Sequence, residues 1–235
     1  VPTPDGFRRH GDLRPGDFVY HPSGAPVQVL AISDESPQDL EVEFMDGSRI
    51  RCHEAHEWTV YDRSRGEWRT VETGYLMSQC LVSGPKSRAR FQLPLYNAVE
   101  GTPQQLPIDP YFLGVWLGDG KSSEPVICGC AEDMAHITAL IPYERGARQV
   151  HPPTGVVYQM FVGGIRARLR IAQLLNNKHI PAQYLSASVE QRYRLLEGLV
   201  DTDGSVDPVT QRVRFRSGNQ RLAADVAALV RSLGY

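Results

Sequence analysis

Two aspartates, each standing directly before a glycine at the end of one of two matching segments, are the residues of this chain that point most clearly to chemistry. Asp119 closes an apolar run that begins at Phe112, and Asp203 closes a segment from Leu196 that repeats the same pattern. If both runs are helices, each carboxylate lies at the negative end of a helix dipole, where it is disfavoured. A carboxylate kept there against that cost is a candidate cation ligand. A pair of them suits Mg²⁺ or Mn²⁺, which bind carboxylates together with water and substrate phosphate.

The two runs must meet for these acids to act as a pair, and their glycines predict that they do. Gly114 and Gly118 are four residues apart and lie on one face of a helix. Each glycine costs a helix about 1 kcal/mol relative to alanine, so two on one face indicate that another backbone approaches closely. Gly198 aligns with Gly114 when Asp203 is aligned with Asp119, at a spacing of 84 residues (203 − 119). This spacing is typical of a duplicated subdomain whose two copies pack helix against helix.

Capping residues indicate where both helices begin and end. Asp109 is a suitable N-cap, and Pro110 suits the first helical position. Gly120 is predicted to end the first helix in the left-handed conformation. Ser188 and Gln191 fit a capping box ahead of the second helix. Both acids are therefore predicted to lie in the last turn of a capped helix.

The first half of the chain predicts a compact all-β domain. Short apolar runs alternate with turn signals such as Pro15-Gly16-Asp17 and Asp46-Gly47-Ser48. The predicted strands are 18–21, 27–32, 40–44, 50–52, 58–61 and 68–71, and the last of them enters a short helix at 73–77. Residues 94–110 are rich in Pro and Gln and are predicted to be extended. We place the domain boundary there, dividing residues 1–105 from 106–235.

The second half predicts alternating strands and helices. After the first motif helix we expect a strand at 125–130, a helix at 132–140, a strand at 156–162 and a helix at 165–175. After the second motif helix we expect a hairpin of 205–207 with 212–216, and then a helix at 220–232 that Asn219 caps.

Basic residues in this half predict contacts with DNA. Arg212, Arg214 and Arg216 alternate with apolar residues, which on a strand would put three guanidinium groups on one face. Such a face can contact phosphate or guanine edges in the major groove. A solvated sheet face is the alternative. Arg166 and Arg170 lie at the start of a predicted helix and suit phosphate contact.

Together the paired motifs resemble those of the LAGLIDADG homing endonucleases. The second copy, from Leu196 to Gly204, is closely similar to the nine-residue motif of that family, and the first copy is similar more loosely. The resemblance implies an α+β domain of pseudo-twofold αββαββα repeats that cuts double-stranded DNA as a monomer. It makes Asp119 and Asp203 catalytic Mg²⁺ ligands. Lys178 lies in a stretch that resembles the block carrying an active-site lysine, where it would stabilise charge at the phosphate; a surface lysine is the alternative.

The first half resembles the Hint fold of inteins, in residues 1–19 and 47–60. His56 occupies the position of a histidine that bonds to the scissile amide in that family, although His53 replaces a frequent threonine. The resemblance implies splicing out of a host protein, whose exteins would be partners. In that family the first residue is a Cys or Ser nucleophile and the last is Asn. Val1 and Tyr235 therefore predict an intein trimmed at both ends that cannot splice as written. A structural histidine is the alternative for His56.

Charge and composition narrow the class of protein. The net charge is −2, but residues 1–109 carry 11 Lys/Arg and 16 Asp/Glu, whereas 110–235 carry 14 and 11. The basic excess thus lies in the half with the paired helices, as phosphate binding requires. No apolar run reaches the roughly 18 residues of a membrane helix, and the four cysteines form no disulfide framework, which predicts a cytoplasmic protein without membrane partners. A DNA-binding module that no longer cuts and an autoprocessing Hint protein with a scaffold second domain stay open.

Overall fold

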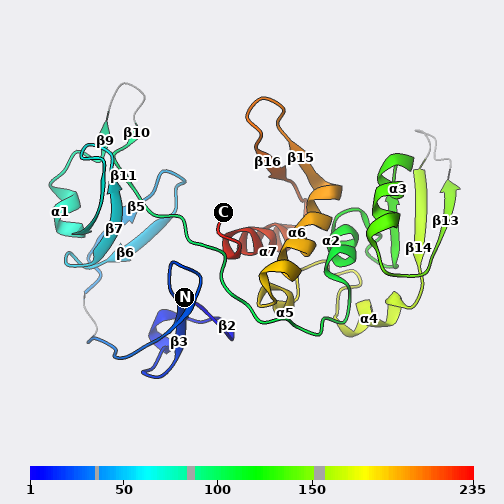
Figure 1. Cartoon of the computed structure of the whole chain (residues 1–235), viewed down its shortest axis with the longest axis horizontal. Coiled ribbons are helices and arrows are strands. Elements are labelled where there is room, and N and C mark those ends of the chain that lie inside the picture. The colour runs from blue at the N-terminus through cyan, green and yellow to red at the C-terminus, as the bar shows by residue number, and fades with distance from the viewer. Residues whose placement is uncertain (35–36, 84–87, 151–156) are drawn as a thin grey trace. The chain divides into compact units, whose positions relative to one another are not determined.

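The structure is a computed structural model and describes residues 1–34, 37–83, 88–150 and 157–235 (Figure 1). The chain forms two compact units: unit 1 combines Val1–Gln28 with Tyr96–Tyr235, and unit 2 is Val29–Leu95. This division differs from the predicted one at 105/106. The reason is a set of backbone bonds between distant segments: the Asn97 amide donates to the Pro22 carbonyl at 3.0 Å, and the Glu100 amide donates to the Gly24 carbonyl at 3.0 Å.

Unit 2 is built from short antiparallel strands around a small apolar core. Its elements are β5 (Leu40–Glu43), β6 (Arg49–Cys52), β7 (Glu57–Asp62), β8 (Glu67–Glu72), α1 (Thr73–Met77), β9 (Val82–Ser83), β10 (Arg88–Ala89) and β11 (Phe91–Gln92). One sheet has the order β11-β7-β8, and β5 pairs with β6. Cys52, Trp58, Val60 and Val71 form the buried core. These elements agree with the strands expected at 40–44, 50–52, 58–61 and 68–71 and with the helix at 73–77.

The N-terminal part of unit 1 consists of two hairpins and one helical turn. They are β1 (Pro2–Thr3), β2 (Gly6–Phe7), the 3-10 helix η1 (His10–Asp12), β3 (Phe18–Tyr20) and β4 (Pro26–Gln28). β1 pairs with β2, and β3 pairs with β4. The strand expected at 27–32 ends at Gln28, because only residues up to that point have a partner in β3.

The rest of unit 1 is helical with two small sheets. Its elements are α2 (Pro110–Asp119), β12 (Val126–Gly129), α3 (Ala131–Leu140), β13 (Arg145–Val150), β14 (Val157–Val162), α4 (Ile165–Ile171), α5 (Ala182–Leu185), α6 (Val189–Asp203), β15 (Gly204–Val206), β16 (Val213–Phe215) and α7 (Gln220–Ser232). The first sheet is antiparallel with the order β12-β14-β13, and β15 pairs with β16 as a hairpin that follows α6 directly (Figure 1).

Two details of this part differ from expectation. Strand β13 was not predicted, because its stretch is polar and lacks an alternating pattern. The helix expected at 165–175 ends at Ile171, since Gln173 and Asn176 adopt left-handed conformations with φ of 56° and 57°. A left-handed residue cannot continue a right-handed helix.

Helix α2 is the centre of the unit 1 core. Every residue from Tyr111 to Leu117 is buried, as expected for a helix that is apolar on all sides. It packs along α6 on one side and against β12 on another (Figure 1). Within the described ranges, no helix is both long and apolar enough to cross a membrane.

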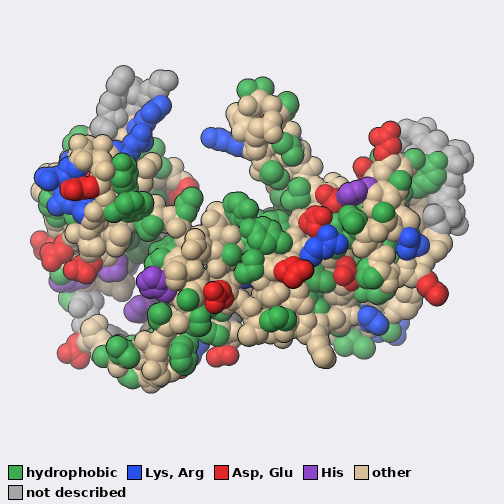
Figure 2. Space-filling view, viewed as in Figure 1, with side chains coloured by type: hydrophobic (Ala, Val, Ile, Leu, Met, Phe, Trp, Pro, Cys, Tyr) green, Lys and Arg blue, Asp and Glu red, His purple; other side chains and the backbone are tan. Residues whose placement is uncertain are grey.

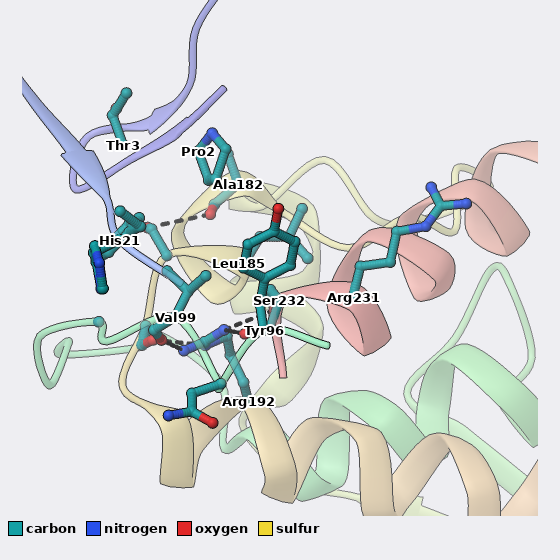
Figure 3. Close-up of a pocket in the computed structure, with 15 residues that line it drawn as sticks. Pro2, Thr3, His21, Tyr96, Val99, Ala182, Leu185, Arg192, Arg231 and Ser232 are labelled. Atoms are coloured by element: carbon teal, nitrogen blue, oxygen red, sulfur yellow. Dashed lines mark hydrogen bonds between the residues drawn. The ribbon is translucent and has the colours of Figure 1, made fainter. Parts of the chain in front are cut away.

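A cavity of about 420 Å³ lies in unit 1 among its N-terminal strands and α5, α6 and α7 (Figure 3). The fully buried Arg192 lines it and donates from Nη1 to Ser232 O at 2.6 Å and to Ser232 Oγ at 2.7 Å, and from Nη2 to the Val99 carbonyl. Ser232 ends α7, and the last carbonyls of a helix carry partial negative charge. The guanidinium is therefore compensated by a helix end, and it ties residue 99 to the helical core.

Candidate functional site: an acid pair at paired helix ends

The glycines of the two motif helices allow α2 and α6 to touch backbone to backbone. A Cβ atom on Gly114 would lie 2.3 Å from the Leu195 carbonyl oxygen of α6. A Cβ atom on Gly198 would lie 2.2 Å from the Tyr111 carbonyl oxygen of α2. Both distances are far below any real Cβ contact, so each helix needs a glycine where the other crosses it. The structure thus places these residues in the predicted helix interface.

The same contact continues to the ends of the helices, where the acids are. A Cβ atom on Gly118 would lie 2.1 Å from Thr202 Oγ1 and 3.6 Å from the carboxyl carbon of Asp203. The carboxyl group of Asp203 therefore lies beside the last turn of α2, which ends at Asp119. The structure brings the two acids to adjoining helix ends although 84 residues (203 − 119) separate them.

The residues that cap both helices explain where the acids fall. Asp109 accepts from the Phe112 amide at 2.9 Å. Ser188 Oγ accepts from the Gln191 amide at 3.3 Å, and Gln191 Oε1 accepts from the Ser188 amide at 3.2 Å, which completes a capping box. Both predicted starts are thus present in the structure.

The glycines after the acids have a different role from the predicted one. Gly120 has φ −73° and ψ 148°, and Gly204 has φ −85° and ψ 156°, so both are extended and neither is left-handed. A Cβ atom at these positions would lie 2.3 Å from the Trp116 carbonyl oxygen and 2.2 Å from that of Val200. The chain therefore needs glycine here because it leaves each helix close to the preceding turn.

The surroundings of the acids oppose their ionisation. Burial raises the pKa of Asp119, and the neighbouring charge of Asp203 raises it further. Burial also raises the pKa of Asp203. The ammonium group of Lys178 lowers both pKa values but does not outweigh the burial. Two half-buried carboxyl groups at one place favour a cation between them.

Lys178 lies at the acid pair and not on an open surface. Its Nζ donates to the Gly118 carbonyl at 2.9 Å and stands 5.4 Å from the centroid of the Trp116 ring. Burial lowers the pKa of Lys178, and the charges of Asp203 and Asp119 act in the opposite direction. Three segments that are remote in sequence therefore contribute one ionisable side chain each to a single site.

The donor set limits the metal that could bind here. The described part of the chain contains no group of three or more His, Cys, Asp or Glu side chains that could hold a metal ion. Two carboxylates do meet the smaller requirement of Mg²⁺ or Mn²⁺ when water and a substrate phosphate supply the other ligands.

The predicted arginine strand lies on the β15–β16 hairpin. Only Arg214 is inside β16, while Arg212 and Arg216 flank it, and all three are exposed; we call them the hairpin arginines. Phe215 packs on the core, but Val213 is exposed like the arginines beside it, so the expected alternation between faces is present only at Phe215. Arg214 Nη2 lies 3.5 Å from Asp207 Oδ2. Figure 2 shows a basic side chain standing off this hairpin into solvent.

Arg166 and Arg170 are exposed on α4, away from the acid pair. Their neighbour Arg168 donates from Nη1 to the Pro107 carbonyl at 2.9 Å, which fixes α4 beside the start of α2. The acids lie at the other end of α2, and a helix of this length spans about 15 Å. The structure therefore does not bring these two arginines to the acids.

His56 is an exposed residue of unit 2. Its ring packs edge-on against Trp58, with centroids 4.6 Å apart. Its carbonyl accepts from the Thr73 amide at 2.9 Å and from Thr73 Oγ1 at 3.1 Å. His53 Nδ1 accepts from the Ala55 amide at 3.1 Å and closes the preceding turn. A role for His56 in peptide cleavage stays a prediction.

A hydrogen-bonded group beside the motif helices was not predicted. Tyr111 Oη donates to Asp201 Oδ2 at 2.8 Å, and His136 Nε2 lies 3.2 Å from the same oxygen. Burial raises the pKa of Tyr111, and the bond to Asp201 adds to this shift. The group links α2, α6 and α3, over which acidic, basic and histidine side chains gather in Figure 2. A tyrosine inside an apolar helix was the available signal, since a buried phenol needs a partner.

Comparison with known proteins yields one informative relative. No family model matches the chain. Over 255 aligned residues the chain is 35% identical to a replicative DNA helicase DnaB from Mycobacterium intracellulare, and the match covers 100% of this chain and 41% of that protein. The chain thus spans less than half the length of the curated relative it matches.

This comparison corrects the family assignment made from the motifs. The assignment to an intein with an embedded LAGLIDADG endonuclease is wrong as a family identification, because no such model matches and the relative bears the name of a helicase. The physical reason is that two nine-residue motifs specify a helix contact, and one contact geometry can serve several functions. At a coarser level, a match of the whole chain to part of a longer helicase is what an intein-containing region of such a protein would give.

Proposed function

We propose that unit 1 is a Mg²⁺-dependent DNA endonuclease carried within a replicative helicase protein. The observation that supports it most is the convergence of Asp119, Asp203 and Lys178 at the ends of α2 and α6. The match of this whole chain to part of a helicase supports its location within a helicase protein. The exposed hairpin arginines next to α6 provide positive charge where a DNA backbone would approach.

The residues of the site suit hydrolysis of a phosphodiester. Asp119 and Asp203 would hold the metal, which would neutralise phosphate charge and lower the pKa of a bound water. Lys178 Nζ is held at the Gly118 carbonyl in the last turn of α2, within electrostatic reach of both carboxylates, and would stabilise the charge that develops on the phosphate oxygens. Because Gly114 and Gly198 hold the helices in contact, the acids need little rearrangement when DNA binds.

A nucleotide-driven helicase motor explains the residues of this chain less well than an endonuclease does, despite the name of its relative. The chain contains one Gly-Lys-Ser sequence, Gly120 to Ser122, and the residue five places before its glycine is Val115 where a P-loop has glycine. A P-loop also opens a helix after a strand, whereas this sequence follows the end of α2. The loop thus lacks both the sequence and the setting that cradle phosphates.

The experiment is cleavage of a supercoiled plasmid library with random inserts, read by sequencing the new ends. We expect the purified chain to produce linear molecules with common ends in Mg²⁺ or Mn²⁺ and none in EDTA. Asp119→Asn should abolish linearisation while DNA binding, measured by mobility shift, remains. Asp133→Asn is the matched control, since it changes an exposed aspartate of α3 near the pair and should cut as the wild type does.

Two outcomes would count against the proposal. Equal cleavage by the wild type and by Asp119→Asn/Asp203→Asn would show that another site or a contaminant cuts DNA. Binding to DNA with no cleavage in any divalent metal would favour the DNA-binding module. Such a module would have the same contacts between side chains at the site but would not cut DNA.

A further inference from the structure

We propose that helix α7 positions Lys178 for its role at the acid pair, with Asn219 and Asp225 as the positioning residues. This inference rests on the proposed function and adds to it a set of residues outside the motif helices. The segment between α4 and α5 carries Lys178, and side chains of α7 hold that segment in place.

The segment that carries Lys178 has an unusual backbone. Gln173 and Asn176 both have positive φ, at 56° and 57°. Residues other than glycine rarely adopt this conformation, and it persists only where the surroundings determine it. The Asn176 amide donates to the Ser122 carbonyl at 2.8 Å, which fastens the segment to the loop after α2.

The first turns of α7 supply the other fixed points. Asn219 Nδ2 donates to the Lys178 carbonyl at 2.8 Å. Asp225 Oδ2 accepts from the Ile180 amide at 2.9 Å. The backbone is thus held at Lys178 itself and two residues beyond it. A third side chain of α7, Arg221, donates from Nη1 to Asn177 Oδ1 at 3.2 Å.

These bonds matter because a lysine side chain is long and flexible. Holding it in one conformation costs rotamer entropy. Lys178 is held at both ends: its carbonyl by Asn219, and its Nζ by the Gly118 carbonyl at 2.9 Å. Because the backbone is fixed, the side chain has fewer conformations to lose when its ammonium group is held at the acid pair.

Asn219 performs two tasks, one with each polar atom of its amide group. Its Oδ1 accepts from the Leu222 amide at 3.2 Å and caps α7, while its Nδ2 donates to Lys178. Serine at this position would keep a good cap but would lose the Nδ2 group that donates to the Lys178 carbonyl. The substitution Asn219→Ser therefore separates the structural task from the positioning task.

The first test uses single-turnover cleavage of a DNA identified with the wild-type protein. Asn219→Ser should lower the cleavage rate constant by about 10- to 100-fold, the loss that a small misplacement causes. The DNA dissociation constant and the midpoint of urea unfolding should stay at the wild-type values. Gln220→Ser, which changes the neighbouring exposed amide of α7, is the matched control and should have no effect.

A double-mutant cycle decides whether Asn219 acts through Lys178. In a Lys178→Ala background, Asn219→Ser should cause no further loss of rate. An equal loss in both backgrounds, or a wild-type rate for Asn219→Ser, would overturn the inference. A change confined to DNA affinity would overturn it too.

A second measurement separates this inference from the proposed function. Trypsin cleaves after lysine, so the rate of cleavage of the bond between Lys178 and His179 reports how firmly the segment is held. Asn219→Ser should raise this rate at least severalfold, and Gln220→Ser should not. If the wild type cuts no DNA, the proposed function fails, and the tryptic rate alone decides: a rise supports the positioning by α7, and an unchanged rate overturns it.

Discussion

The contact between α2 and α6 leads to a prediction for Gly198→Ala. The added Cβ would lie 2.2 Å from the Tyr111 carbonyl oxygen and 2.9 Å from the Val115 amide nitrogen, and both obstacles are backbone atoms. Ordinary contact begins at 3.4 Å. The helices must therefore move apart, because no side-chain rotation can relieve the clash.

The size of the effect follows from two opposing terms. Overpacking a core costs about 1–3 kcal/mol, and the higher helix propensity of alanine returns about 1 kcal/mol. Because the obstacles are backbone atoms, we expect the upper part of that cost, about 2–3 kcal/mol. The free energy of unfolding of unit 1 should then fall by about 1–2 kcal/mol after the gain in helix propensity. For a unit of this size, each kcal/mol lowers the melting temperature by roughly 2–4 °C. Cleavage should fall further, because separating the helix ends separates Asp119 from Asp203.

The assay is urea unfolding, monitored by hydrogen exchange in peptides from α2 and α6. These peptides report the unfolding of unit 1 separately from that of unit 2. Gly218→Ala is the control, since a Cβ there meets no atom within 4 Å. A second control is Gly118→Ala, whose obstacle is the Thr202 side chain, so adding Thr202→Gly should restore part of the loss. A Gly198→Ala protein as stable as the wild type would refute the reasoning about the helix contact.

Charged groups in the structure lead to three further predictions. Replacing the hairpin arginines by Gln should weaken DNA binding. The slope of the logarithm of the DNA-binding constant against the logarithm of salt concentration should flatten by about 0.9 for each phosphate interaction removed. An unchanged slope would mean that these arginines make no contact with phosphate. Asp119→Asn should stabilise unit 1 at pH 7 in EDTA, since the native pKa is raised, and urea midpoints should show the gain shrinking as falling pH protonates the native carboxyl first. Asp62 is buried in unit 2 and accepts from Arg90 Nε and Nη2 at 3.0 Å, which lowers its pKa. The stability it confers should be present above pH about 4 and be lost as the pH falls further, and Asp62→Asn should remove that dependence.

Much of the local structure could be predicted from the sequence because its causes are local. The N-caps at Asp109, Ser188 and Asn219 and the strands of unit 2 depend on residues a few positions apart. The glycine faces are a special case: Gly114 and Gly198 indicated a close contact, and the partner followed because both helices carry the same pattern. The sequence alone was therefore enough to predict that the two acids are neighbours.

The tertiary structure decided what depends on residues far apart in the chain. The first 28 residues join the helical unit through bonds to residues 97–100, and no local pattern encodes those bonds. Burial of α2 made a partner necessary for Tyr111, and only folding showed that this partner is Asp201. Likewise, Asn219 was predictable as a helix cap, whereas its second bond, to Lys178 across 41 residues, exists only in the folded chain. Short-range hydrogen bonding sets the helices and turns, but the place of each charged group relative to the others is set by packing between segments that the sequence does not bring together.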